Sequence, residues 1–237
     1  MSICKVVFTG GPCGGKTECL EVFRDQLRQT GKSVISIEET ANSLLQLNYM
    51  PGTNISTFDF QNLLFKIQFL KEYFNEKKAD IILCDRGLLD GKVYIGDEDF
   101  KKILSQNKVE EEKIISTYDA ALYFKSIAYE YPDDFILKRI YETAEVGIIR
   151  DKKCKEIWEK KLISHNYDNL DGFEIKKQSI YKSLVTYLNN CKQSQYYCLS
   201  DYYSEEYITF MLNGIENILS NNEVSDDIKI KTRRLVK

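Results

Sequence analysis

Five short apolar runs are spaced along the chain, and each ends at a polar residue or a glycine. The first run, residues 3–8, contains one charged residue, Lys5, and leads directly into a pair of glycines. Short runs rich in β-branched residues are typical of buried parallel strands. The pattern predicts strands at residues 3–8, 33–37, 79–84, 119–124 and 195–199.

The longer segments between these runs carry apolar residues at helical spacing. After the first run, for example, Cys19, Leu20, Phe23 and Leu27 fall on one helical face. The pattern predicts helices at residues 16–28, 42–47, 58–74, 173–188 and 204–219, one or two helices at 97–116 and a long helix at 133–162. Strands that alternate with helices predict an α/β fold, with about five parallel strands and helices on both faces of the sheet.

Length and composition are those of one folded domain. The chain has 237 residues, of which 43% are hydrophobic, so it can bury a full core. We expect a nucleotide-binding domain at residues 1–220 and a polar, then basic, tail at residues 221–237, outside the core. The 33 basic and 36 acidic residues give a net charge of -3, which gives no reason to expect nucleic acid as a partner.

The seven cysteines and the single histidine bear on metal binding and location. The cysteine count is odd, and no pair has the spacing of a zinc ligand set. Reduced thiols in the cytoplasm are the expected state. The chain begins without the pattern of a signal peptide, and no apolar run approaches the ~18 residues of a membrane span.

The strongest signal for function follows the first predicted strand. Residues 10–17 read GGPCGGKT and satisfy the pattern G-x-x-x-x-G-K-[ST]. Its glycines let backbone N–H groups surround an oxyanion, the lysine reaches the β- and γ-phosphates, and the threonine hydroxyl binds magnesium. The residues expected to bind ATP or GTP with Mg²⁺ are Gly10, Gly11, Pro12, Cys13, Gly14, Gly15, Lys16 and Thr17.

Charged residues follow the second and third predicted strands. Ligands of open α/β sheets bind at the carboxyl ends of the strands, so Asp85 is expected near the phosphates. There it would hold a magnesium-bound water or accept a proton. Arg86 is expected to grip a phosphate or an acceptor, whereas the plainer alternative makes Asp85 a helix cap with Arg86 as its surface partner. Glu39 and Asp90 are further candidates for binding an acceptor, and Glu39 is equally suited to cap the following helix.

A helical insertion at about residues 132–165 carries basic residues. Phosphoryl transfer develops negative charge, which a cation on a mobile lid neutralises. Arg139 and Arg150 are the candidates for this role. In the alternative interpretation, Arg139 forms an ordinary i,i+3 surface pair with Glu142. Trp158 is expected to pack in the core rather than to stack on a base.

The guanine-reading motif Asn-Lys-x-Asp is absent. Residues 107–110 read NKVE and lie in a polar insertion, which argues against a Ras-like switch GTPase. The choice between ATP and GTP stays open.

Several of these segments together resemble the NadR-like AAA-domain family. The segments are TGGPCGGKT at 9–17, CDRGLLDGKVY at 84–94 and YDAALYF at 118–124, with Arg139-x-x-Glu142, Asp151, Trp158 and residues 165–173 further along. That family groups the ribosylnicotinamide kinase domain of NadR with eukaryotic GTP-binding trafficking proteins. Thymidylate and adenylate kinases are more distantly similar. The resemblance implies a nucleoside- and nucleotide-kinase-like fold with a helical lid, with Asp85 near the metal.

Two functions are consistent with these features. The first is a phosphotransferase that uses Mg-ATP or Mg-GTP, with Lys16, Asp85, Arg139 and Arg150 as catalytic residues. Thr17 and Asp85 would serve the metal, and a nucleoside, a nucleotide or a similar small hydroxyl compound would be the acceptor.

The second is a regulatory nucleotide-binding module with a protein or phosphoinositide membrane partner. Residues 228–234 alternate apolar and basic positions. They could contact acidic headgroups, but an edge strand, a dimer arm or the start of a further domain fits the pattern better.

Overall fold

A parallel sheet forms the centre of the computed structural model, which describes residues 4–138, 142–163, 169–190, 197–222 and 224–236. Within these residues the sheet has four strands, in the order β2-β3-β1-β4. The strands are β1 (Cys4–Thr9), β2 (Val34–Ile37), β3 (Ile81–Asp85) and β4 (Ala120–Tyr123). The predicted α/β fold with a parallel sheet is confirmed.

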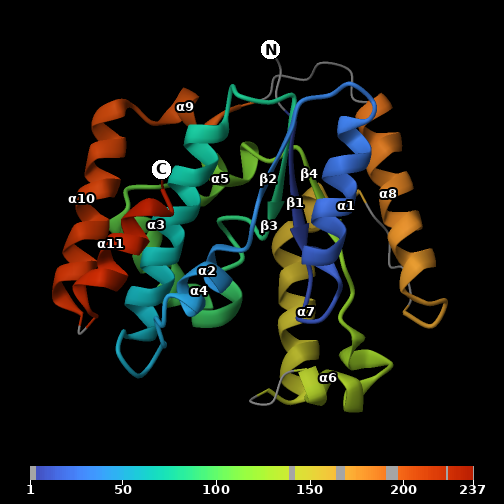
Figure 1. The fold of residues 1–237 in the computed structure, drawn as a ribbon, viewed down its shortest axis with the longest axis horizontal. Helices are drawn as coiled ribbons and strands as arrows, with labels where there is room; N and C mark the ends of the chain where they lie inside the picture. Colours follow the sequence, from blue (N-terminus) through green and yellow to red (C-terminus); the bar gives the residue numbers. More distant parts are fainter. Residues whose placement is uncertain (1–3, 139–141, 164–168, 191–196, 223, 237) are drawn as a thin grey trace.

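Helices cover both faces of this sheet (Figure 1). The α-helices are α1 (Lys16–Arg28), α2 (Thr40–Gln46), α3 (Thr57–Asn75), α4 (Lys92–Gln106), α5 (Glu111–Ser116), α6 (Pro132–Lys138), α7 (Ala144–Trp158), α8 (Phe173–Asn190), α9 (Leu199–Tyr202), α10 (Glu205–Asn221) and α11 (Asp226–Arg234). Two 3₁₀ turns are η1 (Ile127–Tyr129) and η2 (Glu159–Lys161). In Figure 1, α1 and α8 lie on one side of the sheet, and α3, α10 and α11 lie on the other.

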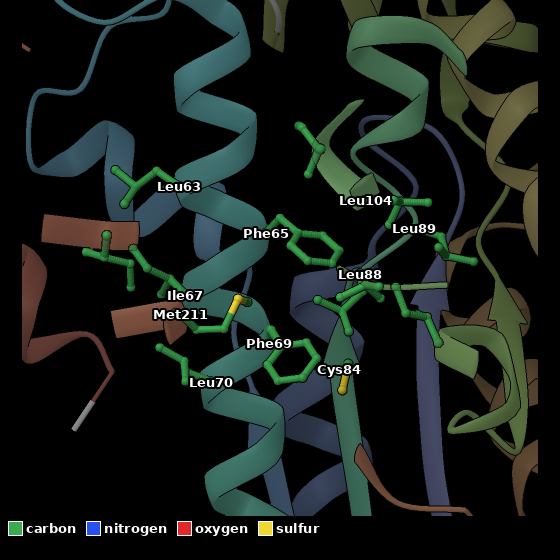
Figure 2. Packing of buried hydrophobic residues seen from close by; sticks show 14 of the residues in the cluster. Leu63, Phe65, Ile67, Phe69, Leu70, Cys84, Leu88, Leu89, Leu104 and Met211 are labelled. Atoms are coloured by element: carbon green, nitrogen blue, oxygen red, sulfur yellow. The ribbon is translucent and has the colours of Figure 1, made fainter. Parts of the chain in front are cut away.

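The alternation of side chains along the strands divides the core in two. In β1, Val6 and Phe8 pack with α1 and α8, whereas Val7 packs with α3. Neighbouring strand residues point to opposite faces, so an apolar run without alternation fits a sheet covered on both sides. Figure 2 shows the α3 side, where Phe65 and Phe69 face Cys84 and Leu88.

The carboxyl ends of the strands meet at one edge of the sheet. Phe8 pairs with Asp85, Thr9 with Tyr123, and Ile37 with Cys84. The loop at residues 10–17, the residues after β2 and the residues after β3 therefore come together at this edge. The candidate site lies there.

Two predicted elements differ from the structure. The fifth strand, predicted at residues 195–199, is wrong where it can be checked, because helix α9 begins at Leu199; residues 195 and 196 lie outside the described residues. The helix predicted across 133–162 is two helices, α6 and α7. Thr143 starts α7 afresh, since its side chain accepts a hydrogen bond from the N–H of Val146.

Lys5 is a buried charge in the central strand. Its ammonium group contacts Glu72 at 3.1 Å and Glu76 at 2.8 Å, both on α3. Glu72 also accepts a hydrogen bond from the hydroxyl of Tyr118. Because a buried ion needs a compensating partner, the only polar residue of the first apolar run fixes α3 against β1.

The C-terminal segment is a docked helix, and the prediction that it lies outside the core is wrong. Thr232 on α11 is buried and its hydroxyl lies 2.8 Å from the hydroxyl of Tyr49. Arg233 makes a two-bond ion pair with Glu216 on α10. Val224 is part of the main core cluster. The edge strand considered for residues 228–234 is likewise not formed, since these residues are helical.

We expect Thr232→Val to lower the free energy of unfolding by about 1–3 kcal/mol, because the substitution leaves the buried hydroxyl of Tyr49 without a partner. Adding Tyr49→Phe removes both hydroxyls, so the double variant should lose less than the sum of the two single losses. Urea unfolding measures these changes. Thr209→Val, at an exposed position of α10, is the matched control. Equal stability of the two valine variants would contradict the docking of α11.

Candidate functional site

The loop between β1 and α1 adopts an unusual backbone path. Gly10 has φ 125°, Cys13 has φ 56° and Gly15 has φ 89°. Residues with side chains avoid this left-handed region, which explains two of the loop's glycines. Successive residues in such conformations direct their backbone N–H groups into one concave site, which can bind an anion.

The carbonyl groups of the loop are held by side-chain donors. These hydrogen bonds run from Lys16 Nζ to Gly10 O at 3.2 Å and to Gly11 O at 2.6 Å, from Arg86 Nη1 to Gly10 O at 3.0 Å, from Ser126 Oγ to Pro12 O at 2.7 Å, and from Lys176 Nζ to Gly14 O at 3.0 Å. With its carbonyl oxygens bound to these donors, the loop can present N–H groups to an anion. The dipole of α1, which begins at Lys16, adds to that attraction.

Asp151 ties the loop to α7. It is buried, and its carboxylate accepts hydrogen bonds from the N–H of Gly11 at 2.5 Å and of Ser126 at 3.1 Å, and from the hydroxyl of Tyr123. Reasoning from the residues alone gave Asp151 no role. Its partner Gly11 is 140 positions away, and no local pattern marks such a contact.

Gly10 is needed for space as well as for its backbone angle. A Cβ atom there would lie 2.2 Å from the carbonyl oxygen of Phe124. We expect Gly10→Ala to lower the affinity for Mg-ATP at least about a hundredfold, because the loop must leave its place at the end of β4. Calorimetry measures the affinity, and thermal unfolding measures the stability of the variant.

Gly31→Ala is the matched control for this prediction. Gly31 also has a positive φ, 84°, but nothing lies within 4 Å of its added Cβ. Gly31→Ala should therefore lower the free energy of unfolding by about 1–2 kcal/mol and leave the nucleotide affinity unchanged. Wild-type affinity in Gly10→Ala would show that the loop does not hold the phosphates in this conformation.

Asp85 and Thr17 lie together beneath the loop. The Thr17 hydroxyl donates to Asp85 Oδ2 at 2.6 Å. Asp85 is 0% exposed, and its Oδ1 has no hydrogen-bond partner among the described residues. Burial raises the pKa of the Asp85 carboxyl, and the nearby Glu39 raises it further. An enclosed carboxylate oxygen without a partner fits a site that receives a cation or its bound water.

The donor set suits magnesium. The described part of the chain contains no cluster of three or more His, Cys, Asp or Glu side chains placed to hold a metal. Magnesium is commonly bound by one or two protein oxygens together with phosphates and water. Thr17 and Asp85 carry oxygens of this kind, and Asp85 Oδ1 has no partner among the described residues.

Arg86 is the centre of a buried network rather than an open phosphate ligand. Its guanidinium contacts Glu39 at 3.2 Å, Asp90 at 3.4 Å and the carbonyl of Gly10 at 3.0 Å. The helix cap with a surface pair considered for this region is not found, since Arg86 and Asp85 are both buried. Arg86, which follows β3, thus connects Glu39 after β2 with Gly10 of the loop.

Asp90 already has four partners. Its carboxylate accepts from Thr9 at 3.1 Å, from the N–H of Gly87 at 2.7 Å and from the indole N–H of Trp158 at 3.2 Å, besides Arg86. These bonds fix the turn after β3. Trp158 is buried, so its expected packing in the core is confirmed.

A cavity of about 280 Å³ opens beside this network, between α2, α3, α4 and α7. Glu39, Arg86, Asp90 and Arg150 all line it. Arg150, on α7, lies 4.9 Å over the ring of Tyr94 and pairs with Glu142. The predicted lid cation Arg139 lies outside the described residues, and so do residues 165–168 of the quoted segment.

A second cavity, of about 560 Å³, lies on the other side of the loop. Cys13, Gly15, Phe173 and Lys176 are among its lining residues. Lys176 is buried, and burial lowers its pKa to about 8. Its three hydrogen-bond acceptors are Gly14 O, Lys125 O and Asn169 Oδ1. Lys176 is a positioning residue that sequence reasoning missed, since its contact with Gly14 spans 162 positions.

Comparison with known families agrees with this geometry. Residues 5–167 match the family model described as AAA domain. The chain belongs to this AAA-domain family of P-loop NTPases. No curated protein matches the chain.

The matched part of the AAA domain ends before α8, although α8 supplies Lys176 and Phe173 to the cavity beside the loop.

The nucleotide-binding character inferred from the loop is supported by the family match and by the parallel α/β fold. Among the helices described, none combines the length and apolar character that crossing a membrane requires.

Proposed function

We propose that this AAA domain is a small-molecule phosphotransferase that uses Mg-ATP or Mg-GTP. The observation that carries the proposal is the cavity beside the loop, because it combines a concave apolar wall with a carboxylate next to the phosphate site. Glu39 lines both this cavity and a smaller one that contains Thr17. A protein that only hydrolyses nucleotide does not need a second pocket beside the phosphate site, whereas a phosphotransferase needs one for its acceptor.

Each residue has a chemical role in the proposed reaction. Lys16 and the loop amides bind the phosphates. Thr17 and Asp85 would hold magnesium, which when bound would neutralise charge on the transferred group. Glu39 takes the proton of the acceptor hydroxyl. The hydroxyl oxygen then bonds to the γ-phosphorus, and the bond from that phosphorus to the β–γ bridging oxygen breaks, releasing ADP or GDP. Arg150, on α7, stabilises the negative charge that develops on the transferred phosphoryl group.

The structure of α11 favours this function over a membrane-binding regulatory module. The basic tail motivated the regulatory alternative, yet Thr232 is buried against Tyr49 and Arg233 is paired with Glu216. A membrane contact that unfolds α11 would break both interactions. The kinase-like interpretation and the NadR-like resemblance point to the same class of acceptor, a small compound with a free hydroxyl.

The test is acceptor-dependent nucleotide turnover. ADP and GDP release is measured with a panel of nucleosides, nucleoside monophosphates and nicotinamide riboside, and the phosphorylated product is identified by mass spectrometry. One acceptor should raise turnover well above basal hydrolysis. Turnover that no acceptor raises, from a protein shown to bind Mg-ATP or Mg-GTP, would exclude the phosphotransferase and favour an NTPase module.

A further inference from the structure

Helix α8 carries a lysine on the face that it packs against the core. Its buried residues are Lys176, Ile180 and Leu184, spaced four apart on one helical face. Ile180 and Leu184 belong to the core cluster that includes residues of α1 and the sheet, and α8 lies beside α1 in Figure 1. Lys176 is only 2% exposed. A buried charge is unfavourable unless a partner compensates it.

The hydrogen bonds of Lys176 fit the charged form of its side chain. Nζ lies 3.0 Å from Gly14 O of the loop, 2.7 Å from Lys125 O and 2.7 Å from Asn169 Oδ1. An ammonium group has three N–H donors, which match these three acceptors, whereas a neutral amine has two. Loss of the proton leaves one acceptor without a donor. The proton on Nζ therefore helps to hold the loop at Gly14.

The carboxylates around Lys176 are bonded to other groups. Glu130 accepts a hydrogen bond from Asn169 and forms an ion pair with Lys125. Asp151 accepts from backbone N–H groups and a tyrosine hydroxyl. The three acceptors of Lys176 are all neutral, so within the described part of the chain its charge has no ion-pair partner.

A second lysine adds to this excess of positive charge. Burial lowers the pKa of Lys176 to about 8, and repulsion from Lys16 contributes to the shift. Asp151, Cys19 and Glu130 act in the opposite direction with smaller effects. Lys16 is also buried, and its contacts are carbonyl oxygens of the loop. Two buried ammonium groups thus contact one loop, and no carboxylate of the described residues forms an ion pair with either.

The remaining titratable groups near Lys176 do not compensate its charge. Glu18 and Lys138 line the 560 Å³ cavity with it, but both are exposed, so the solvent screens them. The Cys19 thiol on α1 is neutral at physiological pH, since burial raises its pKa to about 12. On α8 itself, Glu174 is already in an ion pair. An anion bound at the loop is the partner that this arrangement lacks.

We infer that Lys176 is a positioning residue coupled to the nucleotide, and that the protein takes up a proton at Lys176 when a polyphosphate binds the loop. The phosphates supply the missing negative charge, so their binding favours the ammonium form. By linkage, the ammonium form favours nucleotide binding to the same extent. The proton comes from the solvent, and no covalent bond between heavy atoms changes. The inference rests on the nucleotide binding in the proposed function and does not require an acceptor.

The sign of the pH dependence follows from the direction of the pKa shift. In the free protein the pKa of Lys176 is lowered to about 8, and the bound phosphates raise it again. The nucleotide affinity is therefore fully present below about pH 8 and falls as the pH rises through that value.

Calorimetry of the wild-type protein with Mg-ADP and Mg-GDP tests the proton uptake without turnover. At pH 8, titrations in HEPES and in Tris, which differ in ionisation enthalpy, should show about half a proton taken up per bound nucleotide. The affinity should fall about tenfold between pH 7 and pH 9. Binding without proton uptake and with equal affinity at both pH values would overturn the inference while leaving nucleotide binding and the phosphotransferase intact.

Lys176→Met identifies the group that takes up the proton. The variant should bind nucleotide at least about tenfold more weakly at pH 7, without proton uptake and with little change in affinity up to pH 9. Lys176→Gln keeps two N–H donors without the charge and should give the same result, which covers the case in which the methionine variant does not fold. Lys182→Met, at an exposed position of α8, is the matched control. Cys13→Ser should keep the proton uptake, which separates Lys176 from the thiol of the loop.

Two results with the folded variants would contradict the inference. Proton uptake that persists without Lys176 would assign the proton to another group, such as Lys16. An affinity lowered by the same factor at pH 7 and pH 9, relative to the wild type, would make Lys176 a purely structural residue. If the wild type binds neither nucleotide, the inference fails together with nucleotide binding by the loop.

Discussion

Asp85→Asn is expected to lower acceptor-dependent ADP release at least about a hundredfold while the protein still binds nucleotide. The carboxylate lies 2.6 Å from the Thr17 hydroxyl, and its second oxygen is enclosed without a partner among the described residues. An asparagine of the same shape keeps an oxygen for Thr17 but places a neutral group at the cation position. Loss of one electrostatic group at a phosphoryl-transfer site has effects of about this size.

A magnesium titration of the rate identifies the cause. If Asp85 serves the metal, Asp85→Asn should need more Mg²⁺ to reach its maximal rate, whereas the affinity for metal-free ADP should change little. Asp25→Asn, on an exposed carboxylate of α1, is the matched control. An unchanged rate and unchanged Mg²⁺ dependence in Asp85→Asn would remove Asp85 from the site.

Lys16→Met is expected to lower the affinity for Mg-ATP and Mg-GTP at least about a hundredfold. The ammonium group is buried against the carbonyl oxygens of Gly10 and Gly11, and burial lowers its pKa. A polyphosphate is the partner that compensates a charge held in this position. Methionine keeps the aliphatic stem, so loss of binding without loss of folding separates the charge from the packing. Lys32→Met, at an exposed lysine, is the control.

The candidate site could be proposed from the sequence because its main features are local. The loop at residues 10–17 is contiguous, and the apolar run before it forms β1. Asp85 was expected near this loop from one rule, that parallel strands end at the same edge, and the pairing of Phe8 with Asp85 brings the two together. Four of the five predicted strands are found among the described residues for the same reason.

The contacts that shape the loop were not predictable from local patterns. Asp151 binds Gly11, Lys176 binds Gly14, and Arg86 binds Gly10, each across more than 70 positions. The first two contacts depend on how α7 and α8 pack against the sheet, and the third depends on the turn after β3. Arg86 was expected to face a ligand, yet its partners are carboxylates of the protein itself.

The C-terminal segment shows how a short pattern can satisfy two periods. Residues 228–234 alternate apolar and basic positions, as an edge strand does. Ile228, Thr232 and Leu235 are also spaced four and three apart, as on one face of a helix. Burial against Tyr49 and α10 selects the helical period, and that burial depends on residues far away in the chain.

The central claim is that the loop at residues 10–17 binds a nucleotide polyphosphate through its amides and Lys16. Isothermal titration calorimetry with Mg-ATP and Mg-GTP tests it directly. The account predicts one bound nucleotide per chain for the wild type and affinity reduced at least about a hundredfold in Lys16→Met. Absence of binding of both nucleotides to the wild type, or equal affinity in the folded Lys16→Met variant, would contradict it.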